Sequence, residues 1–386
     1  MSMPSLETAF AGLKLSSPVI AASAGTTEKV ELMKIAEENG AGAVVMKSLF
    51  EKEVARVAPT PRFKIIRHDA GKHKTFTLYS YEQASVWGPD RYAQEVERAK
   101  RELRIPVIAS VNCITDEGWK RYSKLMERAG ASALEINVSC PHGSIAFSGE
   151  AVFEMTLNAV RIARSATRIP LIVKLSPQMS MPAAMVKAVE DIGADGVVIF
   201  NRLTGLDIDV EAEAPVMHGG YAGHGGPWAI QYPLRWISEI YPKTRLPIAG
   251  SGGVFNPDDV VKYLLAGATV VQVCTAVYLQ GYGALKRLNA GLREWMERKG
   301  YRRVEEFRGK VSGPKILGID QVRRIHDKIA RVNPDACSGC GTCERICIYF
   351  APKKAGEVYE ITAKCDGCGL CAELCPKAAI SMTQTS

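Results

Sequence analysis

The chain of 386 residues lacks the features that would direct it to a membrane or out of the cell. Its longest apolar runs, such as residues 196–200, are far shorter than the ~20 residues that a membrane-spanning helix requires. The first ten residues contain no long apolar core, so we expect no signal peptide. These absences predict a cytoplasmic protein without membrane association.

No Gly-x-Gly-x-x-Gly pattern follows a predicted strand, so the sequence gives no sign of a dinucleotide site. The net charge of +8 is modest for this length, and we expect most of it on the solvated surface. A basic face would suit an acidic redox partner. Scattered Lys and Arg residues are weak support for RNA binding, and no nucleic-acid partner is expected.

Cysteine is distributed unevenly, with eight of the eleven residues between Cys337 and Cys375. They form two runs of C-x2-C-x2-C-x3-C, the bacterial ferredoxin pattern for two 4Fe-4S clusters, in which the fourth Cys of each run ligates the other cluster. Zinc sites prefer C-x2-C pairs with longer gaps. One departure is that Ile348 follows the first run, where Pro376 follows the second. The predicted ligands are Cys337, Cys340, Cys343 and Cys375 for one cluster, and Cys365, Cys368, Cys371 and Cys347 for the other.

Short apolar segments alternate with amphipathic helical segments along most of the chain, which favours a (β/α)8 barrel over an open sheet. Residues 6–15 precede them and predict a hairpin that turns at Gly12 and plugs the base of the barrel. The predicted strands are residues 19–22, 43–46, 106–110, 133–138, 170–175, 196–200, 247–249 and 269–273.

Two connections exceed ordinary loop length, which suggests substrate loops or lids. They are an irregular excursion over residues 50–87 and a second loop over 201–227. We expect three parts in the chain: a catalytic barrel over 1–305, a linker over 306–332 with a basic helix from 319, and a two-cluster ferredoxin domain over 333–386. A cluster pair fused to a redox barrel implies that electrons pass between them.

Polar residues follow several predicted strands. One strand ends in Asn137, Ser139 and Cys140, and Pro141 stops it, so these side chains are expected at the carboxyl-terminal mouth of the barrel. Lys47 and Lys174 end two other strands, where a lone buried ammonium would be costly. They could extend to solvent at the rim. We interpret them as contacts to an electron-rich ring.

Two glycine-containing loops predict a phosphate site. Residues 250–254 follow the seventh strand, and residues 272–276 follow the eighth strand and enter a helix. Glycines allow backbone N–H groups to close on a phosphate, and barrels of this type commonly hold a phosphate at these two loops. The sequence therefore predicts a phosphate-bearing cofactor.

From Pro18 to Pro376 the chain resembles the dihydroorotate dehydrogenase-like flavoproteins, and most of all the pyrimidine-reducing domain and C-terminal ferredoxin of dihydropyrimidine dehydrogenases. The segments that carry the resemblance are residues 137–142, 47–48, 174–177, 252–253 and 272–276. The resemblance implies an acid/base role for Cys140 and contacts from Asn137, Ser139 and Asn201 to substrate amides. It implies an FMN contacted by Ala22, Ser23, Lys47, Lys174, Gly226, Gly252, Gly253, Cys274 and Thr275.

The chain departs from these families around the substrate. It lacks the Asn-rich Met-Gly loop of dihydroorotate enzymes, and Thr75 and Thr77 stand where dihydropyrimidine dehydrogenases have Asn and Glu. Arg202 replaces a Thr, and because Arg forms bidentate pairs with carboxylate or phosphate, it suggests an anionic group on the substrate. Alternatively, Arg202 pairs with an acid of its own loop, Asp207 or Glu211. His142 either positions substrate or is an ordinary rim residue.

These residues predict an oxidoreductase that uses FMN and iron–sulfur clusters on a CH–CH bond of a dihydropyrimidine-like cyclic amide. A Cys with a pKa near ~8.5 is protonated at neutral pH, so Cys140 can donate a proton opposite the hydride. We expect the clusters to exchange electrons with a redox partner, an NAD(P)H-flavoprotein subunit or a ferredoxin, in a homo- or hetero-oligomer.

Three alternatives remain open. One is a dihydroorotate dehydrogenase with a ferredoxin-type acceptor. Another is an electron-transfer subunit whose barrel has lost its substrate. The third is a tRNA-dihydrouridine synthase, which would need an RNA-binding domain where this chain has a ferredoxin module.

Overall fold

The computed structural model describes residues 3–51, 60–70, 73–81, 84–138, 149–216, 221–317 and 327–385. The chain divides into two compact units, Met1–Ile316 and Leu317–Ser386. Within the described ranges, none of the helices combines the length and the apolar character needed to cross a bilayer.

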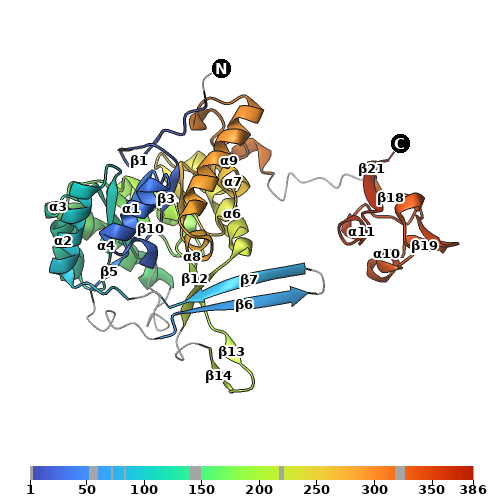
Figure 1. Cartoon of the computed structure of the whole chain (residues 1–386), viewed down its shortest axis with the longest axis horizontal. Coiled ribbons are helices and arrows are strands. Elements are labelled where there is room, and N and C mark those ends of the chain that lie inside the picture. The colour runs from blue at the N-terminus through green and yellow to red at the C-terminus, as the bar shows by residue number, and fades with distance from the viewer. Residues whose placement is uncertain are drawn as a thin grey trace. The chain divides into compact units, whose positions relative to one another are not determined.

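The larger unit is a closed barrel, formed in the described residues by eight parallel strands (Figure 1). The strands follow the order β4-β3-β17-β16-β11-β10-β9-β8, and β8 pairs back with β4 to close the ring. This confirms the predicted (β/α)8 architecture. The barrel strands are β3 (Val19–Ala21), β4 (Ala43–Val45), β8 (Val107–Asn112), β9 (Ala133–Asn137), β10 (Leu171–Lys174), β11 (Gly196–Ile199), β16 (Ile248–Ser251) and β17 (Val270–Val273).

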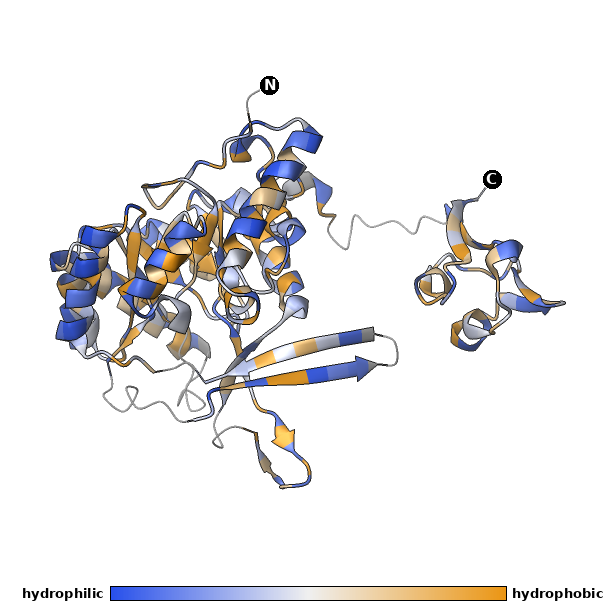
Figure 2. Cartoon of the chain, viewed as in Figure 1, coloured by the Kyte–Doolittle hydropathy of each residue, from blue (hydrophilic) through white to orange (hydrophobic). Residues whose placement is uncertain are grey.

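Helices surround the barrel, and each buries an apolar face against it. The barrel strands are therefore mostly apolar, whereas hydrophilic residues lie on the outer faces of the helices (Figure 2). Two helix starts carry side-chain caps: Thr115 accepts a hydrogen bond from Gly118 N, and Asn256 forms a capping box with Asp259. The helices of this unit are α1 (Val30–Glu38), α2 (Pro89–Glu102), α3 (Asp116–Arg128), α4 (Gly149–Ala166), α5 (Pro182–Ile192), α6 (Gln231–Ile240), α7 (Pro257–Ala266), α8 (Thr275–Gln280) and α9 (Gly283–Lys299).

The base of the barrel interior is filled by apolar side chains, one or two from each strand. The N-terminal hairpin of β1 (Thr8–Phe10) and β2 (Leu13–Leu15) packs Phe10 and Leu15 against them, as expected of a plug. The turn places Gly12 at φ 77°, a left-handed conformation that favours glycine. The strand residues of this base layer are Ile20, Ala43, Val45, Ile108, Ala133, Ile172, Val198, Ala249 and Val270.

Much of the described part of the excursion after the second barrel strand is regular, so the predicted irregular loop over residues 50–87 is wrong there. After β5 (Leu49–Phe50) it forms two antiparallel strands, β6 (Phe63–Ala70) and β7 (His73–Ser80). Both strands are rich in β-branched and aromatic residues, which favour extended structure. Their signal is hidden because β7 borders hollows on both faces, so burial does not alternate along the strand as it does in a sheet with one face in water.

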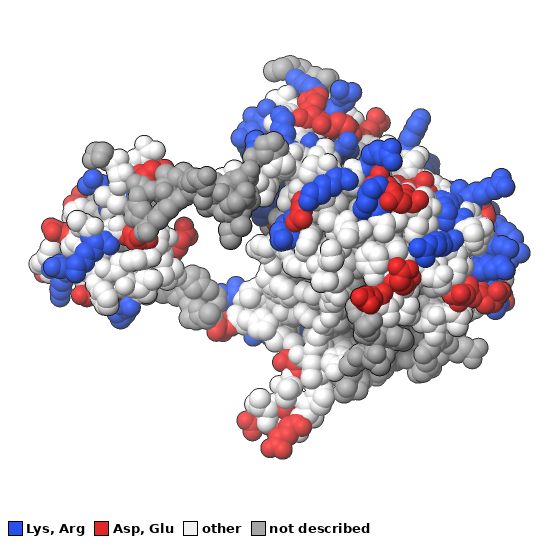
Figure 3. All heavy atoms as spheres, turned by 180° about the vertical axis from the view of Figure 1, so that it is seen from behind, with Lys and Arg blue, Asp and Glu red and all other residues white. Residues whose placement is uncertain are grey.

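The long connection over 201–227 supplies two further strands to this excursion. β12 (Leu203–Gly205) and β15 (Ala222–Gly225) extend it to an antiparallel sheet in the order β12-β15-β7-β6. A small hairpin, β13 (Ile208–Asp209) and β14 (Ala214–Pro215), projects from the same connection, and its exposed acidic residues form a negative tip (Figure 3). On the face shown there, Lys and Arg elsewhere are interspersed with Asp and Glu.

The described residues of the smaller unit form two short α-helices, α10 (Thr342–Ile346) and α11 (Leu370–Glu373), and two antiparallel strand pairs. β18 (Lys328–Val332) pairs with β21 (Ile380–Gln384), and β19 (Pro352–Ala355) pairs with β20 (Val358–Ile361). Its core is formed by Ala330, Cys343, Tyr359 and Ile380.

The predicted basic helix over 319–332 is wrong at its end, because residues 328–332 form strand β18. Ala330 is buried in the core while Lys328 and Arg331 are exposed, so pairing with the C-terminal strand overrides the helical pattern. Residues 318–326 lie outside the described residues. The smaller unit thus begins before residue 333.

Replacing Phe10 by Ala tests the plug. Phe10 is 1% exposed and packs against the base layer, so its truncation should lower the free energy of unfolding by about 3–5 kcal/mol. All five tryptophans lie in the larger unit, so tryptophan fluorescence during denaturant unfolding reports on the barrel alone. The exposed neighbour Lys14→Ala is the control, and an equal effect of both substitutions would contradict a packing role.

Candidate active site

A polar layer lies above the apolar base inside the barrel. Strand side chains alternate between the interior and the helices, so a residue two positions after a base-layer residue also faces the interior. Glu135 follows Ala133 in this way, and the same spacing applies to the other members of the layer. They are Lys47, Ser110, Glu135, Lys174 and Gln272, each at most 5% exposed.

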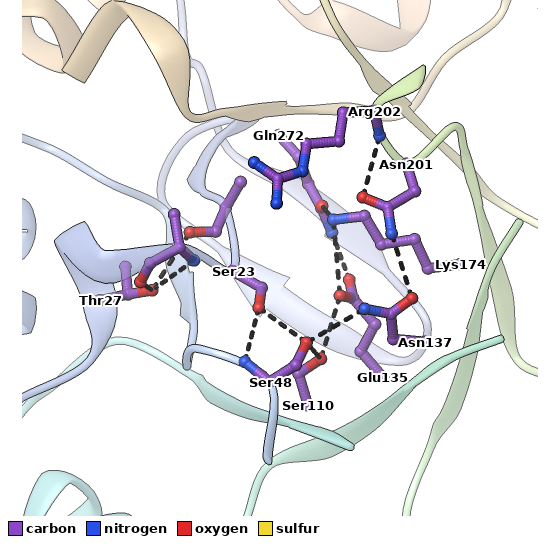
Figure 4. A network of polar contacts seen from close by, with 12 residues as sticks. Ser23, Thr27, Ser48, Ser110, Glu135, Asn137, Lys174, Asn201, Arg202 and Gln272 are labelled. Atoms are coloured by element: carbon purple, nitrogen blue, oxygen red, sulfur yellow. Dashed lines mark hydrogen bonds and ion pairs between the residues drawn. The ribbon is translucent and has the colours of Figure 1, made fainter. Parts of the chain in front are cut away.

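Glu135 and Lys174 form a buried ion pair in this layer, with 3.6 Å between Glu135 Oε1 and Lys174 Nζ (Figure 4). Gln272 bridges them: its Oε1 accepts from Lys174 Nζ at 2.8 Å, and its Nε2 donates to Glu135 Oε2 at 2.6 Å. Ser110 Oγ donates to Glu135 Oε1 at 3.5 Å. Both carboxylate oxygens are therefore satisfied, which a buried charge requires.

Hydrogen bonds continue from this pair to the mouth of the barrel (Figure 4). Ser110 Oγ lies 2.8 Å from Ser48 Oγ, and Asn137 Nδ2 donates to Ser48 Oγ at 3.3 Å. Asn201 Nδ2 donates to Asn137 Oδ1 at 3.1 Å. The structure thus brings together the two carboxamides that the sequence assigns to substrate amides.

A cavity of about 320 Å³ opens above the polar layer. The ends of the barrel strands form its floor, and Leu78, Ser80 and His224 of the antiparallel sheet contribute one wall. Its lining in the described part of the chain contains three cationic side chains and no carboxylate, so it suits anionic ligands. The sequence-predicted residues that line it are Ala22, Ser23, Lys47, Lys174, Gly252, Gly253, Cys274, Thr275, Asn137, Asn201 and Arg202.

Gly252 and Gly253 leave a cradle of bare backbone on one side of this cavity, and Gly226 follows the lining residue Gly225 without lining the cavity itself. A Cβ on Gly253 would lie 2.5 Å from Ile230 N, and one on Gly226 would lie 2.3 Å from Phe76 O. Gly252 has φ +107°, a conformation that favours glycine. Gly226 immediately precedes η4 (Pro227–Ile230), whose Trp228 lines the cavity. This cradle fits a phosphate or the edge of a flat ring, as expected for a cofactor such as FMN.

Arg202 extends along the antiparallel sheet and lines the cavity. Its Nη1 donates to Ser80 Oγ, and a Cβ at Gly223 would lie 1.9 Å from its Nε. The side chain therefore packs directly against the glycine backbone of β15. In the described residues, no ion pair joins Arg202 to Asp207 or Glu211, so the alternative pairing within its loop is not formed.

Thr75 and Thr77 do not lie with the other predicted substrate residues. Successive residues of β7 point to opposite faces, so Leu78 and Ser80 line the cavity while both threonines line a second hollow of about 380 Å³. Thr77 Oγ1 there accepts a hydrogen bond from Trp228 Nε1 at 3.1 Å. Their predicted contact with substrate at Asn137 therefore lacks support from the geometry.

His224 lines both the cavity and the second hollow. Burial lowers its pKa, and the nearby charge of Arg202 adds to the effect, so the imidazole is neutral at pH 7. Its Nδ1 is buried without a hydrogen-bond partner among the described residues. A neutral imidazole can donate or accept a hydrogen bond at the edge of the cavity.

Three predicted residues, Ser139, Cys140 and His142, lie outside the described residues. They follow directly on β9, which ends at Asn137 on the rim of the cavity.

In the smaller unit, a small cavity is lined by Cys337, Cys340, Cys343 and Cys375, three cysteines of the first run and the last of the second. Burial raises the pKa of the Cys343 thiol, so a cation is needed to favour its thiolate. In the part of the chain that is described, no group of three or more His, Cys, Asp or Glu residues is arranged for a metal ion. Each cysteine of a 4Fe-4S cluster binds a different iron atom, so a cluster does not require three ligands around a single ion.

Several site residues escape prediction from the sequence because they lie inside strands or in the antiparallel sheet. Glu135, Ser110 and Gln272 occur within apolar strands, and only their spacing of two from base-layer residues indicates that they face the interior. His224 belongs to the segment that the sequence presents as a long loop, and Trp228 follows that segment directly.

Polar side chains and a cavity at the carboxyl ends of barrel strands are the arrangement of TIM-barrel enzymes. Residues 5–296 match the dihydroorotate dehydrogenase family, and residues 358–381 match the 4Fe-4S binding domain. The chain therefore belongs to the dihydroorotate dehydrogenase family of oxidoreductases, and it carries a ferredoxin motif in addition.

Curated relatives share the barrel region. The catalytic subunit of dihydroorotate dehydrogenase B (NAD(+)) from Thermoplasma volcanium is 32% identical over 311 residues, which cover 80% of this chain and 98% of the relative. The subunit of the same name from Pyrococcus abyssi is 31% identical over 314 residues, covering 79% and 98%. That from Methanosarcina acetivorans is 32% identical over 309 residues, covering 77% and 93%.

Replacing Lys174 by Met tests the buried pair. The substitution leaves Glu135 uncompensated at 0% exposure, so the free energy of unfolding should fall by about 3–5 kcal/mol in fluorescence-monitored denaturation. The control is Lys187→Met, because Lys187 pairs with Asp191 on the exposed surface of α5 and should matter little. Equal losses in the two variants would show that burial does not decide the effect.

Proposed function

We propose that the chain is an FMN- and iron–sulfur-dependent oxidoreductase acting on a CH–CH bond of a dihydropyrimidine-type cyclic amide. The observation that carries this proposal is a cavity lined by three cations and paired carboxamides, with no carboxylate in its described lining, at the mouth of the barrel. A bound flavin would supply or accept the hydride.

The cavity residues have separate roles toward FMN. Gly252 and Gly253, with Cys274 and Thr275, would hold the phosphate end, because their backbone allows close approach of an anion. Lys47 and Lys174 would face the ring, where a positive charge stabilises electron density. Ala22 and Ser23 would complete the floor, and Gly226, which follows the lining residue Gly225, would contact the flavin from its side.

Asn137 and Asn201 would recognise the cyclic amide. A carboxamide offers both a donor and an acceptor, which complements the N–H and C=O groups of the ring. Asn112 Nδ2 donates a hydrogen bond to Asn137 O at 2.7 Å, and Asn201 Nδ2 donates one to Asn137 Oδ1. These two bonds hold Asn137 in a defined orientation. Ser139, Cys140 and His142 follow on the same segment. Cys140 would exchange the proton and Ser139 and His142 would hold the substrate.

Two 4Fe-4S clusters are supported by the internal symmetry of the smaller unit. Cys347 Sγ accepts from Ala351 N at 3.5 Å, and Cys375 Sγ accepts from Ala379 N at 3.2 Å, four residues on in both cases. Phe350 and Ala378, each three residues after these cysteines, both adopt positive φ, 55° and 48°. The backbone around Cys347 thus resembles that around Cys375, although Ile348 replaces the proline.

The assignment of ligands to the two clusters is supported by a cysteine of the second run that lies with the first run. Cys375 lines the cavity of the first run, so we assign Cys337, Cys340, Cys343 and Cys375 to one cluster and Cys365, Cys368, Cys371 and Cys347 to the other. The clusters would relay electrons between the flavin and a redox partner. A separate partner agrees with the relatives, whose names describe them as catalytic subunits.

Dihydroorotate is the second candidate substrate. Its ring is a cyclic amide that carries a carboxylate, and Arg202 offers the cavity a guanidinium that pairs with no acid in the described residues. The curated relatives named above are dihydroorotate dehydrogenases.

An anaerobic half-reaction tests the proposal. Protein purified without oxygen should contain FMN and iron, and after reduction by dithionite its flavin absorbance should recover rapidly on addition of uracil, thymine or orotate. Recovery with uracil or thymine supports the dihydropyrimidine, and recovery with orotate alone supports dihydroorotate. No recovery with any of them, in protein that holds FMN and iron, would refute both.

Cys140→Ala is the variant that separates catalysis from electron transfer in this assay. Loss of a general acid should slow flavin reoxidation by about 10²–10⁴-fold while FMN and iron contents stay unchanged. A rate equal to that of the wild type would exclude the proton-transfer role.

Arg202→Gln tests the anionic group of the substrate. A charge-assisted hydrogen bond contributes about 1.5–3 kcal/mol, so reoxidation by orotate should slow by about 10–100-fold while that by uracil changes little. Gly223→Ala should have a similar effect, because a Cβ there displaces the guanidinium. Arg235→Gln on the exposed side of α6 is the control. An equal loss with both substrates would contradict a carboxylate clamp.

A further inference from the structure

Glu135 is the one carboxylate of the described polar layer, and the proposed chemistry does not use it. Its side chain is completely buried, yet it does not line the cavity, whereas its partner Lys174 does. A buried charge is costly and usually persists where it serves a partner or a site. Because Glu135 pairs with a cation that lines the cavity, we expect it to serve the site through that cation.

We propose that Glu135 is a positioning residue that holds Lys174 toward the cavity and, by partly compensating its charge, sets the reduction potential of the flavin. The inference rests on the proposed FMN cofactor. Glu135 acts through Lys174 and does not itself contact the substrate.

The hydrogen bonds define how Glu135 positions Lys174. Because a carboxylate only accepts, its Oε2 at 2.6 Å selects the Nε2 end of the Gln272 amide, and the opposite Oε1 end then faces Lys174 Nζ at 2.8 Å. The ammonium is thus held by the carboxylate on one side and by an oriented carbonyl on the other (Figure 4). A neutral amide at position 135 would no longer select this orientation of Gln272.

The charges define how the pair acts on a bound flavin. Two-electron reduction adds negative charge to the ring system, and a nearby ammonium stabilises that charge. An anion 3.6 Å from the ammonium reduces this stabilisation, and it does so strongly because both groups are buried. Removing the charge of Glu135 should therefore favour the reduced flavin and raise its potential.

A purely structural role is the competing explanation, because the pair also fills the barrel interior. Such a role would change stability and cofactor retention but would not shift the potential of a flavin that remains bound. The potential therefore separates the two explanations.

The test measures flavin midpoint potentials by anaerobic titration against a reference dye in the full-length holoprotein, for the wild type, Glu135→Gln, Lys174→Met and the double variant. Glu135→Gln should shift the ratio of reduced to oxidised flavin at least tenfold toward the reduced form, ~30 mV for a two-electron couple. Lys174→Met should shift it in the opposite direction. The double variant, with no charge left, should return close to the wild type.

Gln272→Met is the matched control, because it removes a neutral hydrogen-bond partner of the same ammonium. Its shift should be clearly smaller than that of Glu135→Gln, and an equal shift would overturn charge compensation. An unchanged potential in Glu135→Gln with FMN bound would overturn the proposal as well.

The test remains possible if Glu135→Gln is too unstable to retain FMN. In that case the potential of the double variant is compared with that of Lys174→Met, and equally low potentials in the two would overturn the proposal. Loss of FMN from the double variant too would also overturn it, since the pair would then be needed for binding. Wild-type protein without FMN would instead refute the proposed function.

Discussion

The buried pair of Glu135 and Lys174 is the interaction on which the interior of the barrel depends. A closed barrel of this size must fill its centre with side chains, and apolar residues do so at the base. Above them the interior becomes polar, which is possible only if the charges are compensated and hydrogen-bonded. Ser110 meets that requirement from the neighbouring strand β8, and Gln272 meets it from β17, across the barrel interior. As a result, the Lys174 ammonium at the floor of the cavity is stabilised by protein groups and does not depend on water for its solvation.

The barrel could be predicted from the sequence because its strands are buried on both faces and helices separate them. The expected strands match the observed ones to within a few residues, since apolar runs of four to six residues bounded by Gly, Pro and Asn leave little choice. The hairpin of β6 and β7 could not be recognised in the same way. Its side chains border two hollows and do not alternate between core and water.

Residues at strand ends were predictable, whereas those within strands were not. Asn137, Lys174 and Lys47 stand where a strand meets a loop, so their polar character is conspicuous and their common edge follows from the fold. Glu135 lies inside a strand, and its orientation depends on the phase of the pleat, which only the base layer reveals. The expectation that Thr75 and Thr77 contact substrate rests on the resemblance alone, and the alternation of side chains along β7 places both at the second hollow.

The N-terminal plug has a consequence for the order of folding. Phe10 and Leu15 leave the ribosome before any barrel strand, yet the surface against which they pack extends from Ile20 to Val270. That surface is complete only when the last barrel strand, β17, has joined β3. Residues synthesised before every barrel strand are therefore among the last to acquire their native contacts, and the whole barrel is translated before those contacts can form. Such long-range contacts slow folding and leave apolar side chains exposed meanwhile, a period in which a chaperone would be of most use.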